Sequence, residues 1–353
     1  MKTVIIRYPD DEIKYRRFYQ NMTIPLAQHS WEWQCVIANW PTIEWSALAL
    51  LDCVGEIEAC IPFGCISNSI GKIIMSSPLP ASYGGVLLSK KANPEHCYKR
   101  LLTELIEYAK KNGIDLISIF TSPFREDYHM YKEYFMHDYE LLKTYQYIDI
   151  NKNEVENLMN RNIKRNLKKS LQNNLIFFQT QNPSKDLIDE WYNKVVLPRF
   201  YNKGANIPDI KLFYLIASYL KDSGMFKFSY IRKNKEMVSG GVNLYGWSED
   251  IYLRVSNQNG LELGAGVLFD YLSIKDGEYS NISYINFQSS PTRDSTSFKY
   301  KQQWGCQENP CYYLVKVITD VRKFTKINID MILKQFPYFF VLPYDVWNNS
   351  NSI

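Results

Sequence analysis

The order of helices and strands along the chain repeats itself, and this repeat constrains the fold more than any single motif. In the first half, apolar periodicity and turn signals predict helices over 30–39 and 94–111, a short helix near 131, a hairpin of strands 47–51 and 57–66, and strands over 115–120 and 144–150. In the second half, they predict helices over 185–200, 209–220, 264–275 and 294–303, and strands over 225–231, 238–244, 251–256, 282–287 and 312–318. Because the pattern repeats and the residues do not, we predict two similar α/β domains with mixed sheets and flanking helices.

The length of 353 residues is enough for two domains with sizeable cores. We place an N-terminal domain at 1–150, a C-terminal domain at 151–320, and a C-terminal helix with an aromatic tail at 321–353. We expect this tail to pack on the body. With 46% hydrophobic and 22% charged residues, the composition excludes a disordered or fibrous chain.

The sequence indicates a cytoplasmic protein without a metal site. No apolar run reaches the roughly 18 residues of a membrane span, although an exposed run at 336–342 could contact the inner face of a membrane or a second copy. The seven Cys form no CxxC pair, and all four His lie in the first half, which disfavours a disulfide framework and a metal cluster.

The positive charge of the chain is concentrated in one stretch. A net charge of +4 is too small to predict a DNA-binding protein, yet Arg161, Lys164 and Arg165 recur at helical spacing opposite an apolar stripe. This amphipathic helix either presents a solvated face or binds phosphates of a nucleotide, a coenzyme, an RNA or a lipid head group.

A second candidate phosphate site precedes the helix predicted from residue 264. Gly264, Ala265 and Gly266 could let a cofactor approach the exposed N–H groups at the start of that helix. The alternative is that the glycines serve close packing.

Three segments of the chain resemble a known family. They are Ser82-Tyr83-Gly84-Gly85 after Pro78-Leu79-Pro80, the basic stretch from Arg161 to Arg165, and Phe298-Lys299 followed by Trp304-Gly305. Their order and spacing resemble the FemABX-like acyltransferases of the GNAT superfamily and their CelD/BioF-like relatives. The small residues Ser239-Gly240-Gly241 before Tyr252-Leu253-Arg254 also fit the central hairpin of this family.

The resemblance implies two tandem GNAT-like domains and an acyltransferase activity with no tightly bound cofactor. The donor would be an acyl-coenzyme A or an aminoacyl-tRNA, and the acceptor an amine of a cell-envelope precursor: a nucleotide- or lipid-linked amino sugar or a peptidoglycan peptide. Lys299 would stabilise the transition state, although it could also be an ordinary exposed helical lysine. Contacts to the substrates would come from Tyr83, Gly84, Gly85, Arg161, Lys164, Arg165, Arg254, Phe298 and Trp304.

The chain departs from the family at two points. It has Gln288-Ser289-Ser290 where many relatives carry Gly-Arg-Ser, so a contact made by that Arg would have to come from another residue such as Arg293. No heptad insertion forms a coiled-coil arm between the domains, and this absence leaves the donor open. Two functions without catalysis are alternatives to the acyltransferase. One is a non-catalytic module that binds tRNA or another phosphate polymer, and the other is a membrane-surface partner in polysaccharide assembly.

Overall fold

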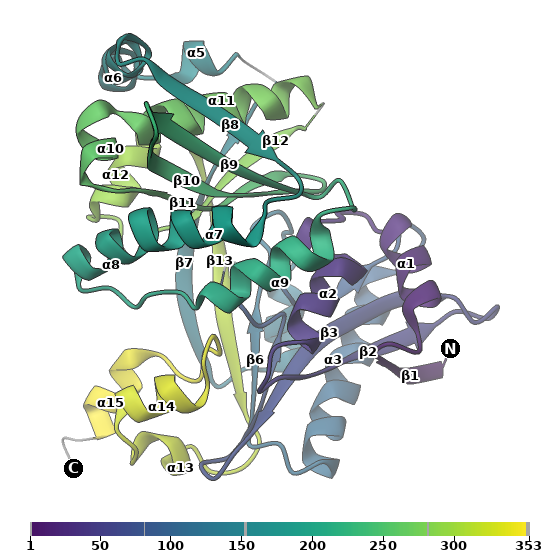
Figure 1. Ribbon diagram of the computed structural model, residues 1–353. Helices are drawn as coiled ribbons and strands as arrows, with labels where there is room; N and C mark the ends of the chain where they lie inside the picture. The colour runs from purple at the N-terminus through teal and green to yellow at the C-terminus, as the bar shows by residue number, and fades with distance from the viewer. Residues whose placement is uncertain (1, 81, 152–153, 281, 351–353) are drawn as a thin grey trace. The chain divides into compact units, whose positions relative to one another are not determined.

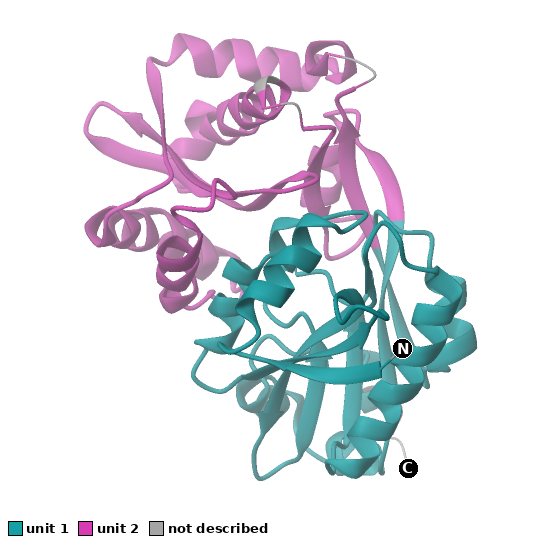
Figure 2. Cartoon of the chain, turned by 90° about the vertical axis from the view of Figure 1, so that its right-hand side faces the viewer, with its two compact units in different colours: residues 1–143, 310–353 teal, residues 144–309 magenta. Residues whose placement is uncertain are grey.

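The structure is a computed structural model that describes residues 2–80, 82–151, 154–280 and 282–350. It divides into two compact units, coloured separately in Figure 2: unit 1 contains residues 1–143 and 310–353, and unit 2 contains residues 144–309. The chain therefore passes between units at 143/144 and 309/310, and not after residues 150 and 320. Both units are α/β, which confirms the predicted fold class.

Unit 1 is built on a mixed sheet with the strand order β1-β2-β3-β4-β6-β13. Among the strand pairs that the described residues of this unit form, only β4 and β6 are parallel, and β5 pairs with β3 at the side. The strands are β1 (Lys2–Arg7), β2 (Glu44–Leu51), β3 (Ile57–Ser67), β4 (Lys72–Ser76), β5 (Leu87–Leu88), β6 (Leu116–Phe120) and β13 (Gln307–Val317). The sequence pattern predicts the hairpin of β2 and β3 but not β1 or β4.

Helix α3 forms much of the core of unit 1. It begins after Asn93, whose side chain accepts a hydrogen bond from the His96 N–H at 3.1 Å, and it ends before Gly113 with φ +63°. Its buried face includes Leu101 and Leu105. The helices of this part are α1 (Glu12–Gln20), η1 (Ala27–His29), α2 (Trp31–Ala38), α3 (Pro94–Lys111), α4 (Tyr128–Met130) and η2 (Tyr131–Phe135).

Unit 2 repeats this arrangement with the strand order β8-β9-β10-β11-β12-β7. In the described part of this unit, only β11 and β12 are parallel, so the parallel pair takes the fourth and fifth places in both sheets. The strands are β7 (Tyr139–Asp149), β8 (Leu175–Thr180), β9 (Phe226–Lys233), β10 (Glu236–Tyr245), β11 (Glu249–Ser256) and β12 (Tyr284–Ser289). The duplicated α/β pattern is thereby confirmed.

The sixth strand of each sheet comes from an unexpected part of the chain. β7 precedes every other strand of unit 2 and pairs with β12, whereas β13 follows unit 2 and pairs with β6 of unit 1. The predicted domain bounds place 144–150 in the N-terminal domain and 312–318 in the C-terminal domain, which is the reverse of the observed pairing. Local patterns show that a strand exists but not which sheet edge it joins, and this explains the difference.

Helices cover both faces of the unit 2 sheet, with α6 and α11 on one face and α7 on the other (Figure 1). A Cβ on Gly240 of β10 would lie 2.6 Å from Trp191 Cδ1, and one on Gly241 would lie 3.0 Å from Phe269 Cζ. Both faces of β10 therefore need glycine for close packing. The helices are α5 (Val155–Leu158), α6 (Arg161–Gln172), α7 (Lys185–Trp191), η3 (Tyr192–Val196), α8 (Leu197–Lys203), α9 (Ile210–Leu220), α10 (Gln258–Leu263), α11 (Ala265–Tyr279) and α12 (Thr296–Gln302).

The C-terminal segment packs within unit 1, as predicted for the tail. It forms α13 (Arg322–Thr325), α14 (Ile329–Gln335) and α15 (Tyr344–Ser350). Phe336, Phe339 and Trp347 are buried, so they do not form the exposed apolar patch that a membrane contact requires. Among the described residues, no helix has both the length and the apolar character needed to cross a membrane.

Glu249, the first residue of β11, is a fully buried carboxyl. Asn243 Nδ2 donates to its Oε1 at 2.6 Å, and the nearby Asp276 accepts from Lys227 Nζ at 2.5 Å and from the Tyr245 hydroxyl at 2.8 Å. Burial, reinforced by the charge of Asp276, raises the pKa of Glu249 to about 8. The carboxyl is therefore protonated in the folded protein at neutral pH.

We expect Glu249→Gln to flatten the pH dependence of stability. The pKa of Glu249 in the folded protein lies above its ordinary 4.5, so the stability it contributes is complete below about pH 4.5 and is lost as the pH rises through about 8. Thermal unfolding should show variant and wild type alike near pH 5 and the variant more stable above pH 8. Glu236→Gln, at an exposed site, should keep the wild-type slope, and an equal slope in Glu249→Gln would contradict the assignment.

Candidate functional site

A pocket lies in unit 2 where the two parallel strands part. The register of β11 and β12 pairs only Glu249 with Ile285 and Asp250 with Asn286. Beyond these pairs, residues 251–254 of β11 and 287–288 of β12 line a pocket of about 540 Å³. Facing strand edges that diverge can hydrogen-bond a ligand instead of each other.

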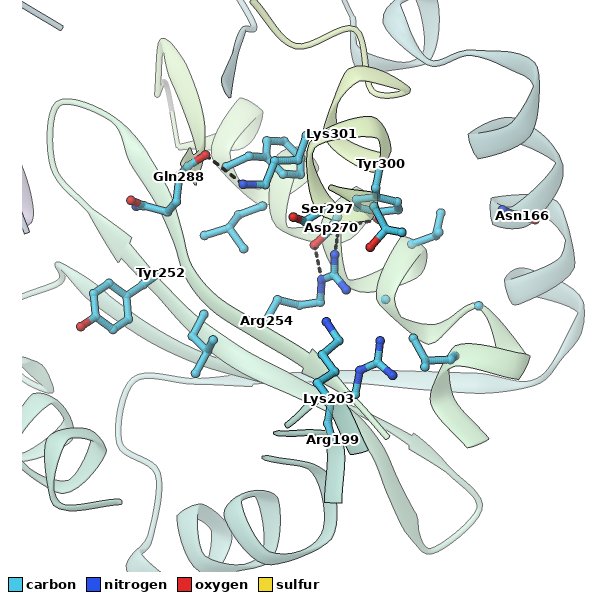
Figure 3. A pocket seen from close by; sticks show the side chains of 18 of the residues that line it. Asn166, Arg199, Lys203, Tyr252, Arg254, Asp270, Gln288, Ser297, Tyr300 and Lys301 are labelled. Carbon is cyan, nitrogen blue, oxygen red and sulfur yellow. Dashed lines mark hydrogen bonds and ion pairs between the residues drawn. The ribbon is translucent and has the colours of Figure 1, made fainter. Parts of the chain in front are cut away.

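The lining of this pocket is strongly cationic. Arg199 and Lys203, one turn apart on α8, point toward Arg254 in Figure 3. Burial, together with the charges of Arg199 and Arg254, lowers the pKa of Lys203. In total, five basic and two acidic side chains line the pocket: Lys169, Arg199, Lys203, Arg254 and Lys301, with Glu262 and Asp270. Such an excess favours an anionic ligand.

Arg254 is fixed in the wall of the pocket by a buried ion pair. Its Nε and Nη2 donate to the two carboxylate oxygens of Asp270 at 3.0 and 2.9 Å, and Asp270 is fully buried. The Tyr300 hydroxyl donates to the same carboxylate at 2.6 Å, and the guanidinium lies over the Tyr300 ring at 5.2 Å. This bidentate geometry leaves Nη1 directed to the remaining side of the guanidinium.

The start of α11 lies beside Arg254. Gly264 adopts φ +76° where α10 joins α11, and a Cβ on Gly266 would lie 2.7 Å from Arg254 Nη1. The first N–H groups of a helix lack partners within it and carry the positive end of its dipole. Gly264 and Gly266 thus line the pocket, whereas Ala265 is buried outside the lining, and their contact with a cofactor stays a prediction.

Lys301 of α12 places its ammonium group at the parted end of the strands. Its Nζ donates to the backbone carbonyl of Gln288 at 2.9 Å (Figure 3) and to that of Ser289, also at 2.9 Å. Burial lowers the pKa of Lys301 to about 8. An ammonium group has three N–H donors, so one remains for a ligand oxygen.

The family resemblance implies a catalytic role for Lys299, but the structure places Lys299 on the exposed side of α12, outside the lining. Helical residues rotate by about 100° each, so Lys299 and Lys301 differ by about 200°. The buried Phe298 lies three residues before Lys301 and on the same side of the helix. That spacing is the signal in the sequence that could have placed Lys301, rather than Lys299, on the buried side of the helix.

Helix α6 contributes other residues than those predicted. Arg161, Lys164 and Arg165 are exposed, while Asn166 and Lys169 of the same helix line the pocket. The basic stretch therefore reaches the rim of the pocket but extends over the protein surface. Arg199, Lys203 and Asp270 were missed because no local motif links residues from separate helices.

Residues 83–85 close the end of the parallel strand pair of unit 1. The Gly84 N–H donates to the Phe120 carbonyl and the Gly85 N–H to Ser76 Oγ, both at 2.8 Å. The buried ring of Tyr83 stacks on Phe120 with centroids 5.9 Å apart. These contacts give the segment a packing role, and its contact with a substrate stays a prediction.

Phe298 and Trp304 support the pocket from behind rather than lining it. Both are buried, and Trp304 packs against the rings of Phe287 and Tyr300, which do line it. The Phe298 carbonyl accepts from Gln146 Nε2 at 3.1 Å. Of the residues predicted from the sequence, the pocket brings together Arg254, Gly264 and Gly266.

Comparison with solved structures places the fold. FemX matches with a TM-score of 0.67 and 12% identity, covering 89% of this chain and 97% of its own. L-PGS from Bacillus licheniformis matches at 0.56 and 12%, covering 94% and 98%, and a tandem GNAT protein from the clavulanic acid biosynthesis pathway at 0.53 and 7%, covering 90% and 99%. The predicted FemABX-like, tandem GNAT-like fold is thereby confirmed. No protein-family model and no curated protein matches the sequence.

We expect Asp270→Asn to destabilise the protein by about 3 kcal/mol, because the largely buried guanidinium of Arg254 loses its counter-charge. Urea unfolding measures the loss. A double variant, Arg254→Met with Asp270→Leu, removes both charges and should recover most of the stability. Wild-type stability in Asp270→Asn would show that the pair is unimportant for holding Arg254.

Proposed function

We propose that the protein is an acyltransferase that moves an acyl or aminoacyl group to an amine, with the donor bound in the pocket of unit 2. The observation that carries this proposal is the ammonium group of Lys301 beside a cationic pocket where β11 and β12 part. The fold supports it. The structure of the tandem GNAT protein is described as the form without AcCoA, which names AcCoA as a ligand of that protein and suggests an acyl-coenzyme A donor here. The FemABX resemblance implies aminoacyl-tRNA as the other candidate donor.

The reaction needs an attacking amine and a positive group beside the carbonyl oxygen. The nitrogen bonds to the carbonyl carbon while the C–S bond of a thioester, or the C–O bond of an aminoacyl ester, breaks. The nitrogen loses a proton and the leaving sulfur or oxygen gains one. Lys301 would stabilise the negative oxygen of the tetrahedral intermediate, and the donor phosphates would lie against Arg199, Lys203 and the start of α11.

The proposed acceptor is the amine of a cell-envelope precursor. The FemABX resemblance supports this choice, and it includes amino sugars linked to a nucleotide or a lipid as well as peptidoglycan peptides. The transfer itself requires no tightly bound cofactor, because the activated ester or thioester already supplies the driving force.

We expect Lys301→Met to lower turnover by about 100-fold or more with little change in donor KM, the effect of losing one stabiliser of the oxyanion. Lys299→Met makes the same change at an exposed site on the same helix and should keep wild-type turnover. The assay follows release of free coenzyme A thiol, or deacylation of charged tRNA, in the presence of amino-sugar and peptide acceptors. Loss of activity in Lys299→Met alone would return the role to Lys299.

A second candidate function is binding of a phosphate polymer without catalysis. The exposed Arg161, Lys164 and Arg165 favour it, because they extend the cationic rim of the pocket over the surface of α6. Polymer contacts of this kind release counterions, so their affinity falls steeply with salt. A pocket for one pyrophosphate responds to salt much less.

Two sets of neutralising substitutions separate these possibilities. Arg199→Gln with Lys203→Gln should weaken binding of acyl-coenzyme A and of charged tRNA alike, whereas Arg161→Gln, Lys164→Gln and Arg165→Gln together should weaken only tRNA. Thermal shifts at about 50 and 200 mM salt measure both, since a ligand at about 100 times its Kd adds roughly 2.7 kcal/mol. Binding of tRNA without transfer would favour the second function, and stabilisation by neither ligand would contradict the donor assignment.

A further inference from the structure

Gln288 has a backbone conformation that glutamine rarely adopts. Its φ is +64°, in the left-handed region, and the register of β12 with β7 shifts between Asn286 and Ser289 around it. This irregular turn directs two successive carbonyls, those of Gln288 and Ser289, to the ammonium group of Lys301. A residue other than glycine keeps such a conformation only where its surroundings enforce it.

Buried polar groups enforce the conformation of Gln288 from three sides. The Tyr145 hydroxyl donates to its Oε1 at 3.2 Å, its Nε2 donates to Asp250 Oδ2 at 3.2 Å, and its backbone N–H donates to Asn286 Oδ1 at 2.8 Å. Asp250 is in turn held by Ser248 Oγ, which donates to Oδ1 at 2.9 Å. All five residues are at least nine-tenths buried, so these bonds do not compete with bulk water.

We propose that Gln288 is a positioning residue for Lys301. Its clamped side chain holds the left-handed turn, and the turn presents the two carbonyl oxygens that fix the ammonium group in the pocket. Two of the three N–H donors are thus committed, and the third has a fixed direction. The consequence for catalysis rests on the proposed function, whereas the positioning itself does not.

The pKa of Lys301 depends on its burial and on the charged groups around it, so a change in this pKa reports a change in the position of Lys301. Burial lowers it, the charge of Arg254 lowers it further, and Cys306 and Asp270 act in the opposite direction. We call the two side-chain hydrogen bonds of Gln288, to Tyr145 and to Asp250, the clamp. If these bonds are lost, the turn relaxes and water reaches the ammonium group of Lys301. The main cause of the shift then weakens, and the pKa of Lys301 moves toward its ordinary value of 10.5.

The test measures the reactivity of Lys301 in ligand-free protein. Trace acetic anhydride labels the neutral amine across about pH 6 to 11, and mass spectrometry of the Lys301 peptide gives the midpoint. We expect a midpoint near 8 for the wild type and a rise of about one pH unit or more in Gln288→Ala. Gln288→Gly allows the left-handed turn without the clamp, so its midpoint should rise as well. A wild-type midpoint in Gln288→Gly would assign the effect to the turn alone and overturn the proposal.

Matched variants complete the test. Gln302→Ala removes an exposed glutamine from the same helix as Lys301 and should keep the wild-type midpoint. Tyr145→Phe removes one of the two hydrogen bonds to the Gln288 side chain and should give a smaller rise of the labelling midpoint. Thermal unfolding reports whether Gln288→Ala folds, and if it does not, Tyr145→Phe provides the test. An unchanged or lowered midpoint in the folded clamp variants overturns the role of Gln288.

Kinetics separate this proposal from the proposed function. In an active enzyme, Gln288→Ala should lower kcat on the order of 10- to 100-fold with little change in donor KM, and the alkaline limb of kcat should move with the labelling midpoint. If the wild type transfers no acyl group from either donor class, the proposed function fails. The labelling midpoints still decide whether Gln288 positions Lys301.

Discussion

The site depends on how long two parallel strands remain paired. β11 and β12 share two registered pairs before they part, whereas β4 and β6 of unit 1 share four, from Ile73↔Leu116 to Ser76↔Ile119. Beyond those four pairs, the backbone of residues 83–85 bonds to the strand ends and fills the space. In unit 2 the corresponding space is the pocket. The same strand order therefore leaves a pocket in unit 2 and a filled space in unit 1, and the difference lies in the register and in the segment 83–85.

Burial acts on the ionisable groups of unit 2 in opposite ways at the two ends of this strand pair. At the paired end, Glu249 is held neutral among polar partners, with a pKa of about 8. At the parted end, Lys301 has backbone carbonyls rather than a carboxylate as its bonded partners, and its pKa is also about 8. Arg254 differs because Asp270 supplies a full counter-charge at 2.9 Å. The structure thus pairs one cation with a carboxylate, whereas the other keeps a lowered pKa and exchanges its proton more readily near neutral pH.

Much of the architecture could be predicted from periodicity, because amphipathic helices and alternating strands report locally on burial. The helix at 94–111 and the duplicated pattern are cases in which local and tertiary signals agree. Strand exchange could not be predicted, since β7 and β13 have ordinary strand sequences whose partners lie far away in the chain. The exposed position of Lys299 was hard to predict for a related reason. Helix α12 has seven residues and one large buried side chain, Phe298, so its apolar pattern only weakly indicates which side of the helix faces the protein.

The lining of the pocket holds more positive than negative charge, and this excess favours an anionic ligand. Of the two carboxylates in the described lining, Asp270 is bound by Arg254, and Glu262 accepts from Gln258 Nε2 at 2.8 Å. Arg199 and Lys203 stand at i and i+4 on α8, where like charges destabilise a helix. Folding holds these two positive side chains close together in the pocket, and a bound anion would reduce the repulsion between them. Anion binding in this pocket would therefore be linked to stability through charge, and an anion that carries several phosphates would gain more from it than a neutral molecule of equal size.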